Sequence, residues 1–143
     1  MAESTEARFV ADVIAAARDA EARHGATVQH LDVAGVRIDL HYAGTSLRDL
    51  LGPALAHLEV EPDTAEMSSS TEPAPVVVRL WDTGSTGVSP PAPPVSRDRF
   101  TDRGDLIGMN DPAYRVAFHW SEYSVCVLDV ASGEAAYWVA DTA

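Results

Sequence analysis

Residues 28–42 read VQHLDVAGVRIDLHY, and this stretch decides the architecture that the sequence predicts. A two-residue turn at Ala34-Gly35 folds the stretch into a β-hairpin in which apolar and polar side chains alternate. Large apolar side chains then fall on one face of the hairpin, namely Leu31, Val33, Val36, Ile38, Leu40 and Tyr42. We expect this face to pack against the core of the protein.

The polar face of the hairpin supports the same register. The turn places Val33 opposite Val36, Asp32 opposite Arg37, Leu31 opposite Ile38 and His30 opposite Asp39. Opposite charges therefore face each other across the two strands, which contributes about 0.2–1 kcal/mol per pair. Ala34 is an unfavourable residue for such a tight turn, because both turn positions prefer residues that tolerate positive φ.

The polar face also suggests a metal site. His30, Asp39 and His41 would converge there, and imidazole with carboxylate suits several divalent ions. The alternative is a solvated sheet face with cross-strand salt bridges. The register favours this alternative, because Val28, which is not a ligand, lies opposite His41.

Helices are predicted on both sides of the hairpin. Residues 6–24 carry apolar side chains at three- and four-residue spacing, and Gly25 follows as a helix end. Residues 46–58 predict a second helix, which Gly52-Pro53 should kink or break.

The rest of the chain is predicted to form strands. Residues 76–82 form one strand, and three more, separated by short turns, suggest an antiparallel meander over 115–120, 123–130 and 135–140. The fold class is therefore α+β: two helices in the N-terminal half, a β-hairpin and a C-terminal meander packed as one sheet domain. We expect a single domain over 1–143, with flexible segments at about 59–75 and 83–104.

Composition narrows the function. The net charge of −12 argues against nucleic acid and anionic membranes as partners. The chain has no apolar run near the roughly 18 residues of a membrane helix, and its first residues do not resemble a secretory signal, so a cytoplasmic location is expected.

All ten basic residues are arginine, which excludes a Schiff-base or P-loop lysine within this chain. The lone Cys126 is predicted to be a small buried hydrophobe.

Residues 80–88 read LWDTGSTGV, and Asp82-Thr83-Gly84-Ser85 after an apolar run resembles the catalytic loop of aspartic peptidases. In a homodimer, Asp82 of each protomer would supply the two carboxylates that share one proton. Leu106-Ile107-Gly108 likewise resembles the element that braces this loop in the family. The spacing argues against a peptidase, because residues 86–105 leave no room for the flap that should lie between the two elements.

A longer set of segments resembles the N-terminal region of HPr-kinase-like bacterial proteins. The resemblance runs over roughly residues 30–141, and its pieces in order are Val33-Ala34-Gly35-Val36-Arg37, residues 50–58, residues 78–88, residues 103–111 with Tyr114-Arg115, Val127-Leu128-Asp129 and residues 136–139. It implies a non-catalytic domain that docks a protein or peptide partner or contacts a kinase-like domain. Phosphoryl transfer is not carried over to these residues, since the chain has neither a Walker motif nor a lysine.

Two interpretations of residues 82–87 follow. In the structural one, Asp82 and its hydroxyl neighbours hydrogen-bond their own backbone at a strand exit. In the functional one, a polar binding surface is formed by Asp82, Ser85, Thr86, Arg103, Asn110 and Arg115. The leading hypothesis is a binding or regulatory domain that needs no cofactor, with the Asp82 peptidase and a small-ligand or metal-binding domain as alternatives. The sequence predicts no particular oligomeric state.

Overall fold

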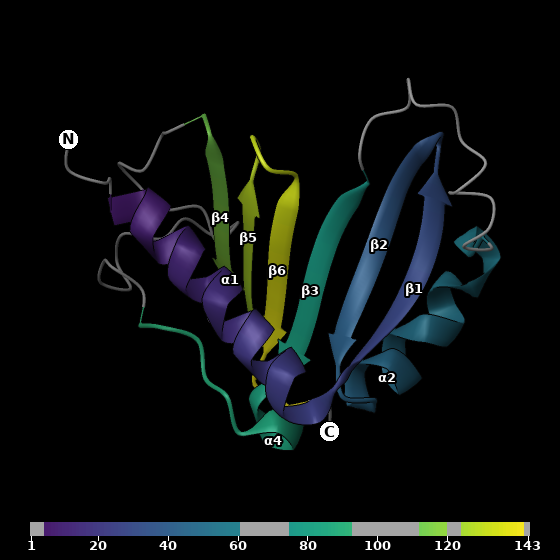
Figure 1. Cartoon of the computed structure of the whole chain (residues 1–143), viewed down its shortest axis with the longest axis horizontal. Coiled ribbons are helices and arrows are strands. Elements are labelled where there is room, and N and C mark those ends of the chain that lie inside the picture. The colour runs from purple at the N-terminus through teal and green to yellow at the C-terminus, as the bar shows by residue number, and fades with distance from the viewer. Residues whose placement is uncertain (1–4, 61–74, 93–111, 120–123, 142–143) are drawn as a thin grey trace.

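A computed structural model describes residues 5–60, 75–92, 112–119 and 124–141 of the chain. One six-stranded sheet, in the order β1-β2-β3-β6-β5-β4, organises these residues (Figure 1). The strands are β1 (Ala26–Val33), β2 (Val36–Ala43), β3 (Val76–Asp82), β4 (Tyr114–His119), β5 (Ser124–Asp129) and β6 (Glu134–Val139). The helices are α1 (Thr5–His24), α2 (Ser46–Leu55), the 3₁₀ helix η1 (Ala56–Leu58) and α4 (Thr83–Thr86). The predicted α+β fold class is confirmed.

The sheet is mixed. Its two outer parts are antiparallel, as predicted: β1 pairs with β2, and β4, β5 and β6 form a meander. The central strand β3 joins these parts and runs parallel to both of its neighbours, β2 and β6. Both parallel pairs thus lie in the middle of the sheet, where helices cover them.

The hairpin of β1 and β2 has the predicted register. His30 lies opposite Asp39, Asp32 opposite Arg37 and Val33 opposite Val36. Ala34 and Gly35 both have positive φ, 53° and 87°, which is the backbone of the primed turn that two-residue hairpins favour. Ala34 is the one non-glycine residue with positive φ in the described part of the chain.

Replacing Ala34 with glycine is expected to stabilise the hairpin. An L-residue with a Cβ atom is penalised by roughly 1–2 kcal/mol in the left-handed region, so Ala34→Gly should raise the free energy of unfolding by about 1 kcal/mol. Urea unfolding measures this change. Ala131→Gly is the matched control, because Ala131 is an exposed turn residue without positive φ; an equal gain there would contradict the explanation.

The two helices cover opposite faces of the sheet. In Figure 1, α1 crosses in front of the strands, and α2 lies behind the hairpin. Successive side chains of β3 lie on opposite faces of the sheet, since Trp81 packs in the α1 layer and Leu80 in the α2 layer. The α1 layer is built around Phe9, Val10, Val13, Ile14, Ala17, Trp81, Val125, Val127 and Trp138. The α2 layer is smaller and contains Leu31, Leu40, Tyr42, Leu47 and Leu80.

Gly52-Pro53 was predicted to kink or break the second helix. It does not break the helix, because α2 continues through Pro53 to Leu55. The change of geometry comes later, where the backbone N–H of Ala56 donates to Pro53 O and η1 begins. The carbonyl of Gly52 accepts instead from the Gln29 side chain, with Nε2 and O 3.3 Å apart. A partner from β1 thus satisfies the Gly52 carbonyl, which the N–H of Ala56 leaves open by donating to Pro53 O.

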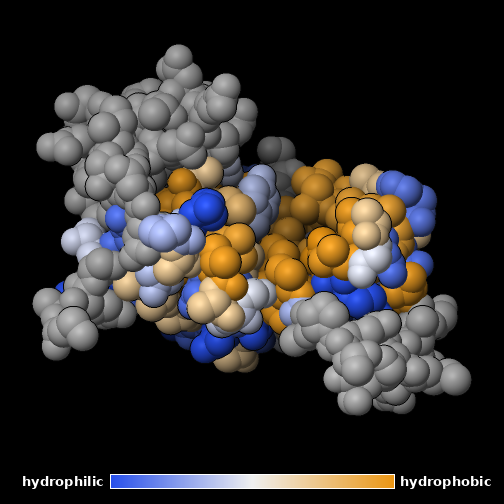
Figure 2. Space-filling view, turned by 90° about the horizontal axis from the view of Figure 1, so that it is seen from above, coloured by the Kyte–Doolittle hydropathy of each residue, from blue (hydrophilic) through white to orange (hydrophobic). Residues whose placement is uncertain are grey.

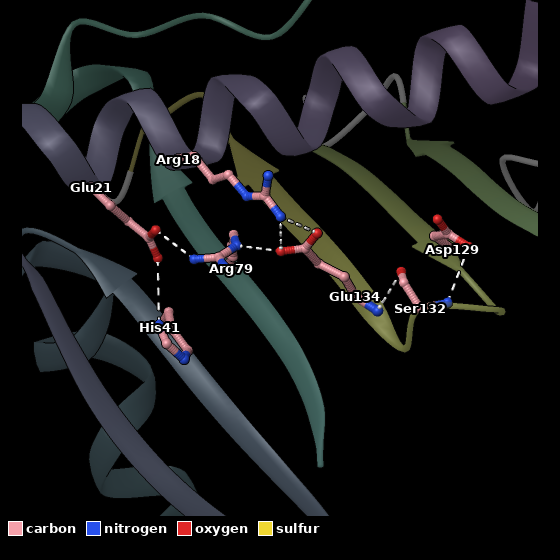
Figure 3. A network of polar contacts seen from close by, with 7 residues as sticks. All are labelled: Arg18, Glu21, His41, Arg79, Asp129, Ser132 and Glu134. Atoms are coloured by element: carbon pink, nitrogen blue, oxygen red, sulfur yellow. Dashed lines mark hydrogen bonds and ion pairs between the residues drawn. The ribbon is translucent and has the colours of Figure 1, made fainter. Parts of the chain in front are cut away.

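Charged side chains tie α1 to the middle of the sheet (Figure 3). Arg79 of β3 donates from Nη1 to Glu21 of α1 at 2.6 Å and from Nε to Glu134 of β6 at 2.7 Å. Arg18 donates to both carboxylate oxygens of Glu134, at 2.6 and 2.8 Å. His41 of β2 extends the network, with Nδ1 3.8 Å from Glu21. The side chains of Arg79, Glu21 and Glu134 are all mostly buried.

Removing the charge of Arg79 is expected to destabilise the fold. Arg79→Met leaves two mostly buried carboxylates without their shared cation, which should lower the free energy of unfolding by about 2–3 kcal/mol. Chemical denaturation measures the loss. The matched control is Arg115→Met on β4, where the exposed Arg115 donates only to the carbonyls of Pro112 and Tyr114; an equal loss at both sites would refute the role of the network.

The network also makes a pH prediction. Burial opposes ionisation of Glu134, but hydrogen bonds and charges from Arg18 and Arg79 outweigh it and hold the pKa of Glu134 below its ordinary value of 4.5. A depressed pKa gives stability that is fully present above the unfolded value and is lost as pH falls through the folded value. The stability difference between the natural chain and Glu134→Gln should therefore shrink as pH drops below 4.5. A difference that stays constant from neutral to acidic pH would contradict this assignment.

Other predictions divide between the described and undescribed residues. Cys126, which was predicted to be a small buried hydrophobe, is largely buried, and this burial raises the pKa of its thiol. Most of the two segments predicted to be flexible lie outside the described residues, so the flexibility stays a prediction. None of the described helices has the length and apolar character to cross a membrane.

Candidate functional site

The Asp82 turn ends β3 and begins α4. Asp82 is fully buried, and its Oδ2 accepts from the backbone N–H of Ser85 at 2.7 Å while its Oδ1 accepts from Ser85 Oγ at 2.6 Å. The Thr86 hydroxyl donates to Asp82 O at 2.6 Å. The predicted self-capping turn is confirmed. The segment predicted to be flexible over 83–104 nevertheless starts with one helical turn, because this cap satisfies the first helical N–H groups.

This geometry gives Asp82 a structural role. Both carboxylate oxygens bind Ser85 within the same turn, and neither reaches the surface. An aspartic peptidase needs the two carboxylates of a dimer to face each other and share a proton. The dimeric peptidase stays a hypothesis that requires this turn to open.

The residues predicted to form a polar binding surface divide into three groups. Asp82, Ser85 and Thr86 lie together in the turn. Arg115 lies on β4, three strands away, where the register aligns it through Leu128 and Ala135 with Val78. The structure does not bring Arg115 to the turn. Arg103 and Asn110 lie outside the described residues.

The predicted metal ligands are engaged with other partners. His30 Nδ1 lies 2.8 Å from Asp39 Oδ1, while His41 faces Glu21 of α1. Within the described ranges, no three histidine, cysteine or carboxylate side chains are grouped as metal ligands. The metal-site hypothesis therefore stays without a coordinating geometry in this part of the chain.

A cleft of about 350 Å³ opens between α2 and the edge strand β1. We call it the α2–β1 cleft, and it is lined by Gln29, Arg48, Asp49, Gly52, Pro53, Ala56 and Glu59. Its volume lies in the range of roughly 300–1,000 Å³ that is typical of ligand sites. The one fully buried residue of α2 is Leu47, and the small residues Gly52 of α2 and Ala56 of η1 leave space beside β1.

Gln29 fixes the polar chemistry of the cleft. Its side chain is buried, and its Oε1 accepts from the hydroxyl of Tyr42 at 2.9 Å. Its Nε2 donates to Gly52 O, and a primary amide nitrogen carries a second N–H as well. Burial raises the pKa of Tyr42; the nearby charge of Arg48 lowers it, and that of Glu59 raises it. Tyr42 thus stays a neutral donor that holds the Gln29 amide in one orientation.

The edge of β1 beside the cleft is partly covered. Glu59 forms an isolated antiparallel bridge with Leu31, and the N–H of Val60 donates to His30 O at 2.8 Å. Arg48 donates from Nη1 to Val28 O at 3.0 Å. Such coverings protect edge strands from unwanted pairing. Here they also place the Glu59 side chain at the rim of the cleft.

Sequence reasoning missed Gln29, although a signal was present. The alternation of β1 puts Gln29 on the same face as Leu31, opposite Leu40, so a polar amide occupies a core position. A buried amide needs hydrogen-bond partners. The alternation predicts an apolar residue at position 29, and the glutamine found there was the signal that could have indicated the cleft.

A second surface is apolar. The end of the sheet at the top of Figure 1 faces the viewer in Figure 2, which shows hydrophobic residues on both sides of a central hollow. The two hairpin turns at this end carry Val33, Val36 and Val130, which are 37, 51 and 50 % exposed. Exposed apolar residues of this size mark contact surfaces in many proteins, but nothing in the described residues indicates which partner would cover this end of the sheet.

Comparison of the chain with protein-family models, with curated proteins and with solved structures found no match. The site must therefore be interpreted from its own residues.

The capping role of Asp82 is testable. Asp82→Ala removes the acceptor for two hydrogen bonds from Ser85 and should lower the free energy of unfolding by about 1–2 kcal/mol. Asp82→Asn keeps one side-chain oxygen for the backbone N–H of Ser85, so its loss should be smaller. Thermal or urea unfolding distinguishes the two variants, and an Asp82→Ala protein as stable as the natural chain would rule out the capping role.

Proposed function

We propose that this chain is a non-catalytic binding domain that docks a peptide segment of a partner protein in the α2–β1 cleft. The observation that carries the proposal is the cleft itself: about 350 Å³ beside an edge strand, with the buried Gln29 amide in its wall. Peptide-binding sites commonly combine a concave surface with a strand edge and a few fixed polar groups. The α2–β1 cleft supplies the concave surface and the fixed polar group, and it lies beside an edge strand whose Val28 and His30 carbonyls already accept hydrogen bonds.

The resemblance to the N-terminal region of HPr-kinase-like bacterial proteins supports the same function. In that group a kinase domain with a P-loop is expected to perform phosphoryl transfer. This chain has no lysine to bind the phosphates. We infer that the domain presents a protein or peptide substrate to such a kinase-like domain and binds no nucleotide itself.

Selection from a random peptide library displayed on phage tests the docking function. We expect the natural chain to enrich peptides that lose binding at least tenfold when Ala56→Trp fills the cleft with an indole. Ala54→Trp is the matched control, because Ala54 is equally an exposed alanine of the same region but does not line the cleft.

Two outcomes would contradict the proposal. One is a selection that enriches no peptide, or only peptides that bind both tryptophan variants as well as the natural chain. The other is saturable binding of ATP to the isolated chain, measured by calorimetry, because a nucleotide-binding domain would belong to a different functional class.

A further inference from the structure

Two carboxylates at the rim of the α2–β1 cleft form no salt bridge with any residue that the structure describes. Asp49 and Glu59 both line the cleft and are exposed. In the described part of the chain, neither carboxylate has a side-chain hydrogen bond or an ion pair. Glu21 of α1 and Glu134 of β6, by contrast, are mostly buried and both pair with Arg79.

The nearest cation is directed elsewhere. Arg48 also lines the cleft, yet its Nη1 donates to Val28 O at 3.0 Å. Its guanidinium carbon lies 5.9 Å from the centre of the Tyr42 ring, a cation–π contact. Arg48 therefore stabilises the wall of the cleft and leaves Asp49 and Glu59 without a salt bridge.

The remaining lining suits a long side chain with a charged end. Pro53 and Ala56 offer apolar surface, on which the methylene stem of an arginine or lysine packs. The Gln29 amide lies deeper, and it is buried and bonded to Gly52 O and to the hydroxyl of Tyr42. The net charge of −12 would also attract a cationic partner over a longer range.

We propose that the α2–β1 cleft selects peptides with a cationic side chain, arginine or lysine, whose charged end lies between the carboxylates of Asp49 and Glu59. This inference rests on the proposed docking function and specifies the chemistry of its ligand. The stem of the side chain lies along Pro53 and Ala56.

Titration with a pair of synthetic peptides tests the inference. The probes are an acetylated and amidated pentapeptide, glycine-alanine-arginine-alanine-glycine, and the same peptide with citrulline, which has nearly the shape of arginine but no charge. Binding is followed through the backbone amide resonance of Gly52. We expect the arginine peptide to bind at least tenfold more tightly than the citrulline peptide.

Charge-neutralising variants complete the test. Asp49→Asn combined with Glu59→Gln should abolish the preference for arginine, and an unchanged midpoint of thermal unfolding would show that the fold is intact. Asp12→Asn, at an exposed position of α1, removes one carboxylate charge outside the cleft. This variant should keep the preference for the arginine peptide.

Failure of the inference and failure of the docking function give different results. The inference that the cleft selects a cationic side chain is overturned if the two peptides bind equally. It is also overturned if the double variant still prefers the arginine peptide. The same holds if the displayed library enriches cleft-dependent peptides without basic residues, in which case the docking function stands. A library that enriches no cleft-dependent peptide overturns both.

Discussion

The pairing of Arg79 with two carboxylates is the constraint on which the rest of the structure depends. Arg79 lies on the central strand β3, between Glu21 of α1 and Glu134 of β6. A mostly buried guanidinium must be matched by charge and hydrogen bonds, because its desolvation costs several kcal/mol. The match fixes α1 along the sheet and joins the strand pair β3–β6, which links the hairpin to the meander (Figure 3). With α1 on one face, the other face of the hairpin is left for α2.

The cleft is a consequence of that arrangement. The hairpin stands at one edge of the sheet, so β1 has a strand neighbour on one side only, apart from the short bridge to Glu59. The α2 layer is the smaller of the two, and Gly52 of α2 and Ala56 of η1 line the cleft next to β1. Gln29 and Tyr42 are hydrogen-bonded to each other inside this layer, which gives the cleft a polar wall. The exposed acids Asp49 and Glu59 lie around it.

Local patterns predicted the parts of this fold better than their assembly. The alternation in residues 28–42 and the facing charges fixed the hairpin register, and the residue types of the Asp82 turn predicted its cap. Contacts between residues far apart in the sequence could not be predicted from such local patterns. Arg79 is separated by 58 and 55 residues from its partners Glu21 and Glu134, and no local periodicity states that β3 inserts in parallel between hairpin and meander. The continuation of α2 through Pro53 was not predicted either, and the free carbonyl of Gly52 is satisfied from another element, by the Gln29 side chain.

The central claim is that this domain docks a peptide in the α2–β1 cleft. It is tested most directly by mapping amide chemical-shift changes of the isotope-labelled chain while a peptide enriched by the natural chain is added. We expect the largest chemical-shift changes at Gln29, Gly52 and Glu59, on the two walls of the cleft. Changes that cluster instead at the Asp82 turn, or along the meander of β4, β5 and β6, would contradict it.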